Sequence, residues 1–136
     1  MTDEQIPEGF EPLFRSSPYL DLLGPIYSRI DEAGLVLGVR AHKKHCNARG
    51  KVHGGVFSSI ADVALGYSAA FAGDTAVPLV TLSLTLDYAG GADEGDWIEI
   101  HSDVQKRGSR MAFVNGYFLV NERRIVRASA VFSVAA

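Results

Sequence analysis

Residues 52–73 contain a single charged side chain, Asp62, in 22 consecutive residues. Apolar side chains recur within this run at spacings of three and four, which places them on one side of a helix; they are Val56, Ile60, Val63, Tyr67 and Phe71. The run therefore predicts one long helix, from about residue 55 to residue 72 and about 27 Å in length. Serines and glycines dilute its start and a carboxylate lies near its middle, which favours a helix buried in a globular fold over a membrane span.

Five other segments carry the pattern of strands. Residues 80–88 alternate strictly between apolar and polar side chains, which predicts a half-buried strand with Thr81 on its polar face. The other candidates are residues 35–40, 96–106, 111–120 and 125–134. Short turns join the last three, so we expect them to be antiparallel neighbours. Because a five-stranded sheet is about 24 Å wide, one helix can cover one face of it, and the sequence predicts an α+β fold with an antiparallel sheet wrapped around a central helix.

The start of the chain adds a shorter helix. Ser17 before Pro18 is typical of a helix N-terminus, and Gly24-Pro25 would end that helix. We expect residues 1–9 to form a flexible arm and residues 10–136 to form one domain, since 136 residues suffice to bury a single core. The second face and the edges of the sheet have no remaining helix to cover them, so we expect a dimer or a dimer of dimers.

Charge and cysteine content exclude several classes of partner. The chain has 13 basic and 16 acidic residues, and 13 − 16 = −3 leaves no basic excess for a nucleic-acid partner. Cys46 is the only cysteine, so no intrachain disulfide can form. The first nine residues have neither the basic flank nor the apolar run of a signal peptide. We therefore expect a cytoplasmic protein that has no membrane partner.

Asp62 is the first candidate for chemistry. It is expected to be buried among apolar helix neighbours, and no lysine or arginine on the same helix can pair with it. An unpaired buried carboxylate costs several kcal/mol or takes up a proton. Two structural alternatives are that Asp62 faces solvent, or that it accepts hydrogen bonds from a neighbouring chain.

The start of the long helix is the second candidate. A helix N-terminus offers free backbone N–H groups, and glycine lets a ligand approach them closely. His53, Gly54 and Gly55 stand at that start, and Asn47 adds a side-chain donor nearby. Such a site suits an oxyanion or a polarised carbonyl. The structural alternative is a tight turn into the helix with His53 as its cap.

These residues together resemble a family signature. They keep the spacing N-x-x-G-x-x-H-G-G, followed by an aspartate and a glycine on the helix: Asn47, Gly50, His53, Gly54, Gly55, Asp62 and Gly66. The pattern is similar to that of the hotdog-fold acyl-CoA thioesterases, and more narrowly to the PaaI-like branch of the 4-hydroxybenzoyl-CoA thioesterase superfamily. The resemblance covers about residues 30–134, and it implies hydrolysis of an acyl-CoA thioester to free acid and coenzyme A.

The resemblance also implies a role for each matching residue. The backbone N–H of Gly54 would polarise the thioester carbonyl, with Asn47 and His53 assisting. Asp62 would act as nucleophile or general base, across a subunit interface, on a thioester held by the Gly54 of the partner chain. Thr81 matches the place of a hydroxyl that positions the nucleophile or water in some members. The sequence leaves open whether Asp62 attacks carbon directly or activates water.

Coenzyme A would be held by a second group of residues: Gly55, Lys106, Arg107, Gly108, Ser109 and Arg110. The three cations of this loop can grip phosphates, although a solvated charged turn is an equal alternative. The resemblance implies no cofactor apart from the coenzyme A carried by the substrate. After Tyr88 the chain departs from many relatives, since residues 89–92 read AGGA in place of a proline-containing turn.

Weaker patterns give the remaining alternatives. His42, His45, Cys46 and His53 do not have the spacing of a closed zinc site, so we expect no metal. Cys46 as a nucleophile is disfavoured, because adjacent side chains such as that of His45 rarely point at one another. Two functions compete with hydrolysis: dehydration or hydration of an acyl thioester on the same fold, and acyl-CoA binding without catalysis.

Overall fold

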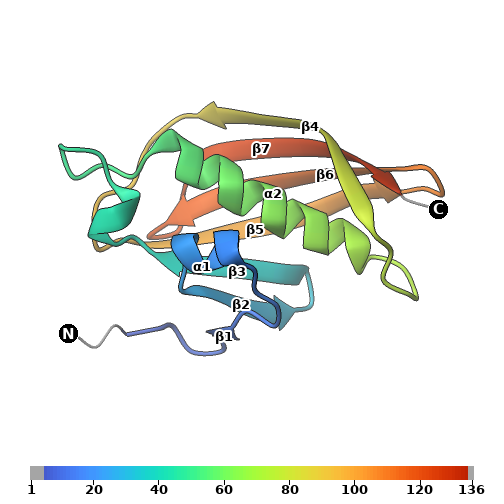
Figure 1. Ribbon diagram of the computed structural model, residues 1–136, viewed down its shortest axis with the longest axis horizontal. Coiled ribbons are helices and arrows are strands. Elements are labelled where there is room, and N and C mark those ends of the chain that lie inside the picture. The colour runs from blue at the N-terminus through green and yellow to red at the C-terminus, as the bar shows by residue number, and fades with distance from the viewer. Residues whose placement is uncertain (1–4, 135–136) are drawn as a thin grey trace.

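The computed structural model describes residues 5–134 and shows one antiparallel sheet curved around one long helix, α2 (Gly54–Ala70) (Figure 1). The sheet has seven strands in the order β1-β2-β3-β5-β6-β7-β4. Their bounds are β1 Glu11–Pro12, β2 Ile26–Asp31, β3 Gly34–Arg40, β4 Leu79–Tyr88, β5 Trp97–Arg107, β6 Met111–Val120 and β7 Arg123–Val134. The predicted architecture is confirmed, and so is the antiparallel pairing of β5, β6 and β7.

Helix α2 is held by its buried face. Six of its side chains are buried against the sheet: Phe57, Ile60, Ala61, Ala64, Leu65 and Ala69. Each of the large ones contributes about 1.5–3 kcal/mol by leaving water. A Cβ on Gly116 would lie only 2.8 Å from the Leu65 side chain, so this glycine allows α2 to pack closely on β6. The helix is thereby fixed across the sheet, with its opposite side left free for other contacts.

The short helix α1 (Pro18–Leu23) forms as its end signals predict. The Ser17 hydroxyl accepts a hydrogen bond from the backbone N–H of Leu20 at 3.2 Å, and the helix stops at Gly24. The Tyr19 hydroxyl then lies 2.6 Å from the Ser59 hydroxyl of α2. This contact ties α1 to the side of α2 that the sheet leaves free.

Strand β2 and the two-residue strand β1 are not predicted by the sequence pattern, so the sheet has seven strands instead of five. Strand β2 reads IYSRID, and both of its faces mix apolar with polar side chains. Ile30, which an alternating pattern would bury, is 78% exposed. Because β2 lies near the edge of the sheet, its two faces differ little in burial, and the alternation that marks a half-buried strand is weak.

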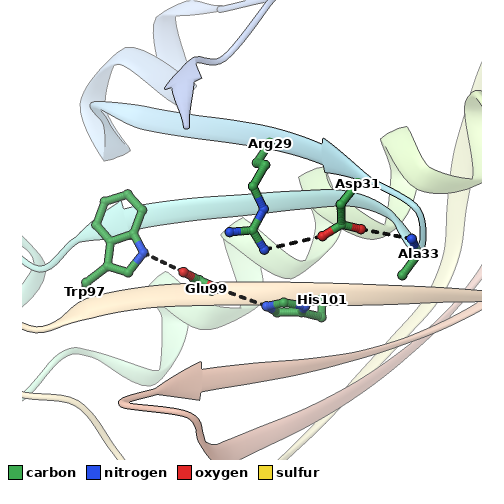
Figure 2. Close-up of polar contacts among 6 residues, drawn as sticks. All are labelled: Arg29, Asp31, Ala33, Trp97, Glu99 and His101. Carbon is green, nitrogen blue, oxygen red and sulfur yellow. Dashed lines mark hydrogen bonds and ion pairs between the residues drawn. The ribbon is translucent and has the colours of Figure 1, made fainter. Parts of the chain in front are cut away.

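The face of the sheet turned away from α2 is polar over β2 and β5 (Figure 2). The Trp97 indole donates to Glu99 at 2.9 Å, and Glu99 also pairs with His101 at 2.9 Å. On β2, which β3 separates from β5, Arg29 pairs with Asp31 at 3.4 Å. Over these two strands the polar side chains pair with one another, and the predicted self-association of the chain stays a prediction.

Residues 1–4 of the expected flexible arm lie outside the described residues. Residues 5–9 form no helix or strand, and the Arg40 guanidinium donates a hydrogen bond to the carbonyl of Gln5. In the part of the chain that the structure describes, the helices are too short or too polar to cross a membrane.

Candidate active site

Asp62 lies at the middle of α2 and is half-buried, on the side of the helix that faces β4. Its Oδ1 accepts a hydrogen bond from the Thr81 hydroxyl at 2.7 Å. The sequence predicts a carboxylate in apolar surroundings without a lysine or arginine partner on its own helix. In the structure Asp62 is half-buried, and its partner is Thr81, the hydroxyl that the resemblance places next to the nucleophile. The second oxygen of Asp62 has no hydrogen-bond partner within residues 5–134.

A β-bulge aims Thr81 at Asp62. The register of β4 against β7 shifts between Thr81 and Ser83, so Leu82 is the extra residue. Before the bulge the side chain of Thr81, an odd-numbered residue, points towards α2. After the bulge the side chains of even-numbered residues, Leu84 and Tyr88, point towards α2 instead. A strict alternation places Thr81 on the opposite face, so the sequence pattern could not predict this contact. Bulges often redirect a side chain at functional sites in this way.

Asp62 and Thr81 border a pocket of about 640 Å³, which we call the site pocket. Its wall is mostly apolar and is built by α1, α2, β4 and β7; Leu20, Gly66, Tyr67, Phe71, Leu79 and Phe132 are part of it. Gly66 follows Asp62 by one helical turn on the same side, so it leaves the space beside the carboxylate open. Pockets of this size and polarity suit a small organic ligand or an acyl group.

The N-terminus of α2 presents two free donors. The backbone N–H groups of Gly54 and Gly55 have no hydrogen-bond partner within residues 5–134, and both residues are exposed. The peptide units that contain these two N–H groups have the carbonyls of His53 and Gly54, and both carbonyls accept hydrogen bonds. That of His53 accepts from the N–H of Val56 at 3.0 Å, and that of Gly54 accepts from the Tyr88 hydroxyl at 2.6 Å. A hydrogen bond to its carbonyl polarises a peptide and strengthens its N–H as a donor.

Tyr88 is the residue that sequence reasoning missed here. It ends β4, touches Gly54 through its hydroxyl, and packs edge-on against Phe57 with the ring centroids 6.0 Å apart. Its place at the end of the alternating strand gave no sign of this contact, because the contact depends on β4 crossing to the far edge of the sheet beside α2.

Asn47 shapes the loop before α2. Its side-chain oxygen accepts from the backbone N–H groups of Arg49 and Lys51, at 2.9 and 3.2 Å. Gly50 in the same turn has a φ of +77°, a conformation that favours glycine. The Asn47 amide nitrogen has no partner among the described residues, so its donor is available to a ligand.

His53 occupies the N-cap position, but its exposed side chain makes no capping hydrogen bond, unlike the structural alternative of a histidine cap. Its backbone N–H donates to the carbonyl of His45 at 2.9 Å, which fixes the entry to α2. The structure thus brings Asn47 and His53 to the same helix start as Gly54 and Gly55, with the Asn47 amide nitrogen and the His53 ring available for further contacts within residues 5–134.

His45 supports this entry from within the core. Its Nδ1 accepts from the backbone N–H of His42 at 2.9 Å, and its Nε2 donates to the carbonyl of Leu23. Burial lowers the pKa of His45, and the electrostatic influence of Lys44 and His42 acts in the same direction, against the opposing effect of the Leu23 hydrogen bond. A neutral His45 therefore joins the loop before α2 to the end of α1.

Gly54 and Asp62 do not face one another within one chain. Eight residues of α2 separate them, which is about 12 Å along the helix axis. Reacting atoms must approach within about 3.5 Å. One carbonyl group therefore cannot contact the Gly54 N–H and the Asp62 carboxylate of the same helix.

Strand β4 is an edge of the sheet and exposes apolar side chains. Val80 is 59% and Leu82 is 56% exposed, and both lie on the strand that carries Thr81. An edge strand of this kind offers unpaired backbone groups and apolar surface to another chain. The exposed apolar surface next to Asp62 therefore lies where a second chain could complete the site.

The basic segment 106–110 forms the turn between β5 and β6 near the C-terminal end of α2. The Arg107 guanidinium contacts the carbonyls of Ala69 and Ala70, at 3.4 and 3.5 Å, so it helps to end the helix. Lys106 and Arg110 are exposed and remain available for phosphates, together with Gly108 and Ser109 between them. The loop thus combines a structural cation with two solvated ones.

The geometry supports neither of the two alternative sites, a metal site and a Cys46 nucleophile. Within residues 5–134 no group of three histidine, cysteine or acidic side chains is arranged to hold a metal ion. The Cys46 thiol lies 3.4 Å from the carbonyl of His42, and burial together with Glu94 and Asp93 raises its pKa. A thiol with a raised pKa carries less of the thiolate that a nucleophile needs.

Comparison with known families gives one match over most of the chain. The family model described as "Thioesterase superfamily" matches residues 49–126, a range that contains His53, Gly54, Asp62 and Thr81. A protein of Pseudomonas aeruginosa named "Putative esterase PA0474" is 51% identical over 128 residues, which cover 93% of this chain and 96% of that protein.

Solved structures share the fold at lower sequence identity. The phenylacetic acid degradation protein PaaI of Thermus thermophilus, solved as a substituted form, superposes with a TM-score of 0.77 at 19% identity, covering 88% of this chain and 100% of that one. A hypothetical thioesterase of Streptococcus pneumoniae, solved with coenzyme A, has a TM-score of 0.73 at 18% identity, covering 82% and 89%. These matches confirm the predicted hotdog fold.

Proposed function

Because the chain belongs to the thioesterase superfamily, we propose that it hydrolyses an acyl-CoA thioester to free acid and coenzyme A. One observation carries the proposal: free N–H donors at the start of α2 and a carboxylate held by Thr81 in an apolar pocket are the two groups that thioester hydrolysis requires. The related fold of the Streptococcus pneumoniae protein was solved with coenzyme A, which supports this choice of substrate class.

The donors at the helix start serve the carbonyl oxygen. Attack on a thioester carbonyl moves negative charge onto that oxygen, and pre-oriented N–H groups stabilise the charge as it develops. The Gly54 N–H fills this role in the proposal, assisted by the Asn47 amide and the His53 ring. Tyr88 acts as a positioning residue, because its hydroxyl holds the carbonyl of Gly54 and so orients the next peptide of the helix start.

Asp62 serves the carbonyl carbon. Thr81 occupies Oδ1, which orients the carboxylate and leaves Oδ2 for the reaction. Oδ2 either attacks the carbon and displaces the thiolate, giving an anhydride that water opens, or takes a proton from a water molecule that attacks instead. Both routes release coenzyme A as a thiol and the acyl group as a carboxylate.

The proposed site is shared between two chains. The 12 Å separation of Gly54 and Asp62 along α2 is too large for one carbonyl, so the Gly54 of one chain works with the Asp62 of its partner. The exposed apolar edge at β4 is where the second chain would pack. In the proposal Gly55, Lys106, Ser109 and Arg110 contact coenzyme A, and Arg107 mainly holds the end of α2 beside them.

A direct assay tests the function. The protein is mixed with short, long and aromatic acyl-CoAs, and free thiol is measured with a chromogenic disulfide. Thiol release above the uncatalysed rate is the expected result, and no release from any member of the panel contradicts the proposal. Two other outcomes identify the competing functions: acyl-CoA binding without release indicates a binding module, and addition of water to an enoyl-CoA without thiol release indicates a hydratase.

A further inference from the structure

A second pocket lies beside the site pocket, where the β2–β3 hairpin meets the C-terminal end of α2. We call it the distal pocket; it has a volume of about 750 Å³, and its wall includes Phe14, Ile30, Leu35, Tyr67, Phe71 and Val104. Tyr67 and Phe71 belong to the walls of both pockets. These two rings therefore stand between the distal pocket and the space that contains Asp62.

The rings between the pockets belong to an aromatic cluster that the core does not enclose. Phe14 lies 5.0 Å from Tyr67 and 5.7 Å from Phe71, measured between ring centroids, and Tyr67 lies 6.1 Å from Phe71. Phe14 is 53% and Phe71 is 54% exposed, so neither ring is fixed by tight packing on all sides. Side chains with this exposure change rotamer on the picosecond-to-nanosecond scale. A ligand can therefore displace them without unfolding the site.

The chemistry of the distal pocket selects an apolar ligand. Its polar side chains are the Tyr67, Ser68 and Ser102 hydroxyls and the exposed Asp103; the two serine oxygens are buried without a hydrogen-bond partner within residues 5–134. No cation lines the pocket to hold an anionic group. A wall made mostly of aliphatic and aromatic side chains, with a few uncharged hydroxyls and no cation, suits a hydrocarbon chain.

The distance between the pockets sets the length of the ligand. Nine residues of helix separate Asp62 from Phe71, which is about 13 Å. With its thioester carbonyl at Asp62, an acyl group must extend at least this far to enter the distal pocket. A compact aromatic acyl group ends within the site pocket, whereas a long unbranched chain passes beyond Tyr67.

We propose that the distal pocket binds the far end of a long, unbranched aliphatic acyl chain, which passes from the site pocket between Tyr67 and Phe71. This proposal rests on the proposed hydrolysis and adds the class of acyl group. Phe14, Tyr67 and Phe71 then form an adjustable constriction along one acyl channel, and the protein prefers long-chain acyl-CoAs to short or aromatic ones.

The test fills the distal pocket without touching the site pocket. Ala72 lines the distal pocket and is exposed, so Ala72→Phe adds volume there without disturbing the core. Thiol release is measured with butanoyl-, octanoyl-, hexadecanoyl- and phenylacetyl-CoA. We expect kcat/KM for hexadecanoyl-CoA to fall about tenfold, the effect of about two methylene groups losing apolar contacts, while butanoyl- and phenylacetyl-CoA change less than about twofold.

Two further variants make the result specific. Ala76 lines the site pocket, so Ala76→Phe is a matched control that should slow all four substrates. Tyr67→Ala removes the constriction and should increase the preference for hexadecanoyl- over butanoyl-CoA, while Tyr67→Phe should leave it unchanged. If Ala72→Phe lowers every substrate equally, or leaves the chain-length preference unchanged, the assignment of the distal pocket is wrong although hydrolysis stands.

Binding separates this proposal from the function on which it rests. If no acyl-CoA releases thiol, the proposed hydrolysis fails, and the channel is tested with hexadecyl- and butyl-CoA thioethers, which cannot be hydrolysed. Calorimetry should then show that Ala72→Phe raises the Kd of the hexadecyl thioether about tenfold and leaves that of the butyl thioether unchanged. Equal Kd values for the hexadecyl thioether in the two proteins would overturn the proposal.

Discussion

The start of α2 and its middle are tied to the same strand in the same way, yet they offer opposite chemistry. At the start, the Tyr88 hydroxyl donates to the carbonyl of Gly54 at 2.6 Å; at the middle, the Thr81 hydroxyl donates to Asp62 at 2.7 Å. The start presents N–H donors for an oxygen that gains negative charge, and the middle presents a carboxylate for a carbon. Strand β4 therefore positions both halves of the proposed site.

The distance between the start and the middle of α2 is too large for one substrate carbonyl to contact both. Both halves belong to one rigid helix, so about 12 Å remains between them whatever the substrate does. Flexibility of loops cannot close this gap. Two copies of the chain, packed so that the start of one α2 approaches the middle of the other, bring a donor and a carboxylate to one carbonyl.

Asp62→Asn gives the largest expected effect. The substitution keeps the shape and the Thr81 contact but removes the basic oxygen from the middle of α2, so kcat should fall about 10²- to 10⁴-fold. Steady-state thiol release measures it. Asp87→Asn, which alters an exposed carboxylate paired with Arg127 on the other face of the sheet, is the matched control and should retain activity. Turnover that survives in Asp62→Asn would remove the carboxylate from the mechanism.

Gly54→Pro tests the start of α2 with a comparable effect. Gly54 is the first residue of the helix, where proline fits well, and His53 already has the extended backbone that precedes a proline. The substitution therefore deletes the N–H with little strain, and kcat should fall about 10²- to 10³-fold. Gly54→Ala adds a Cβ at an ordinary 3.5 Å from Tyr88 and keeps the N–H, so it should stay within a few-fold of wild type. Equal activity of the two variants would show that the N–H is not used.

Tyr88→Phe tests how the start of α2 is held. The ring and its contact with Phe57 remain, but the hydrogen bond to the Gly54 carbonyl is lost. We expect kcat to fall about fivefold with little change in KM, because one hydrogen bond contributes about 1 kcal/mol and its loss loosens the first turn of α2, which presents the Gly54 N–H. Tyr117→Phe, on the opposite face beside Arg124, is the control. A loss in Tm without a loss in kcat would give Tyr88 a structural role only.

The smallest effect concerns stability at low pH. Burial keeps the pKa of His45 below the ordinary value of 6.5, so the unfolded chain binds a proton more readily than the folded one. The stability from the neutral ring is complete above pH 6.5 and is lost as the pH falls from there through the lowered pKa. His45 holds the entry to α2, so acid should loosen the start of the helix before its middle.

Thermal unfolding between pH 8 and pH 5 checks this prediction. Wild type should lose more stability over this range than His45→Gln, because glutamine can accept and donate the same hydrogen bonds without titrating. Parallel pH profiles for the two proteins would exclude a role of His45 in acid sensitivity.

The sequence predicts features that depend on neighbouring residues, and it misses those that depend on distant ones. Ser17, Pro18 and Gly24 define α1 by local capping, and the helical spacing around Asp62 defines α2. The bulge at Leu82 has no local sequence signature, so the alternation predicts Thr81 on the face opposite to Leu84. The family resemblance, in contrast, implies that Thr81 lies next to the nucleophile, and the Thr81 hydroxyl does contact Asp62.

The sequence pattern predicts neither the contact of Tyr88 with Gly54 nor the partial burial of Asp62, and the reason is the same for both. Strand β4 follows α2 in the chain but pairs with β7 at the far edge of the sheet, which decides what lies beside the helix. No periodicity within residues 79–88 encodes that choice. The roles of Gly54, Asn47, His53 and the segment 106–110 are predictions that follow from the resemblance.

Complementation between two inactive variants tests the shared site most directly. Chains with Asp62→Asn and chains with Gly54→Pro are co-expressed with different tags, and the mixed assembly is compared with each parent in the thiol-release assay. A mixed dimer contains one site with an intact Gly54 from one chain and an intact Asp62 from the other, so random pairing should restore about a quarter of wild-type activity. If the mixture stays as inactive as its parents although mixed dimers form, donor and carboxylate do not act across the interface, and the account is wrong.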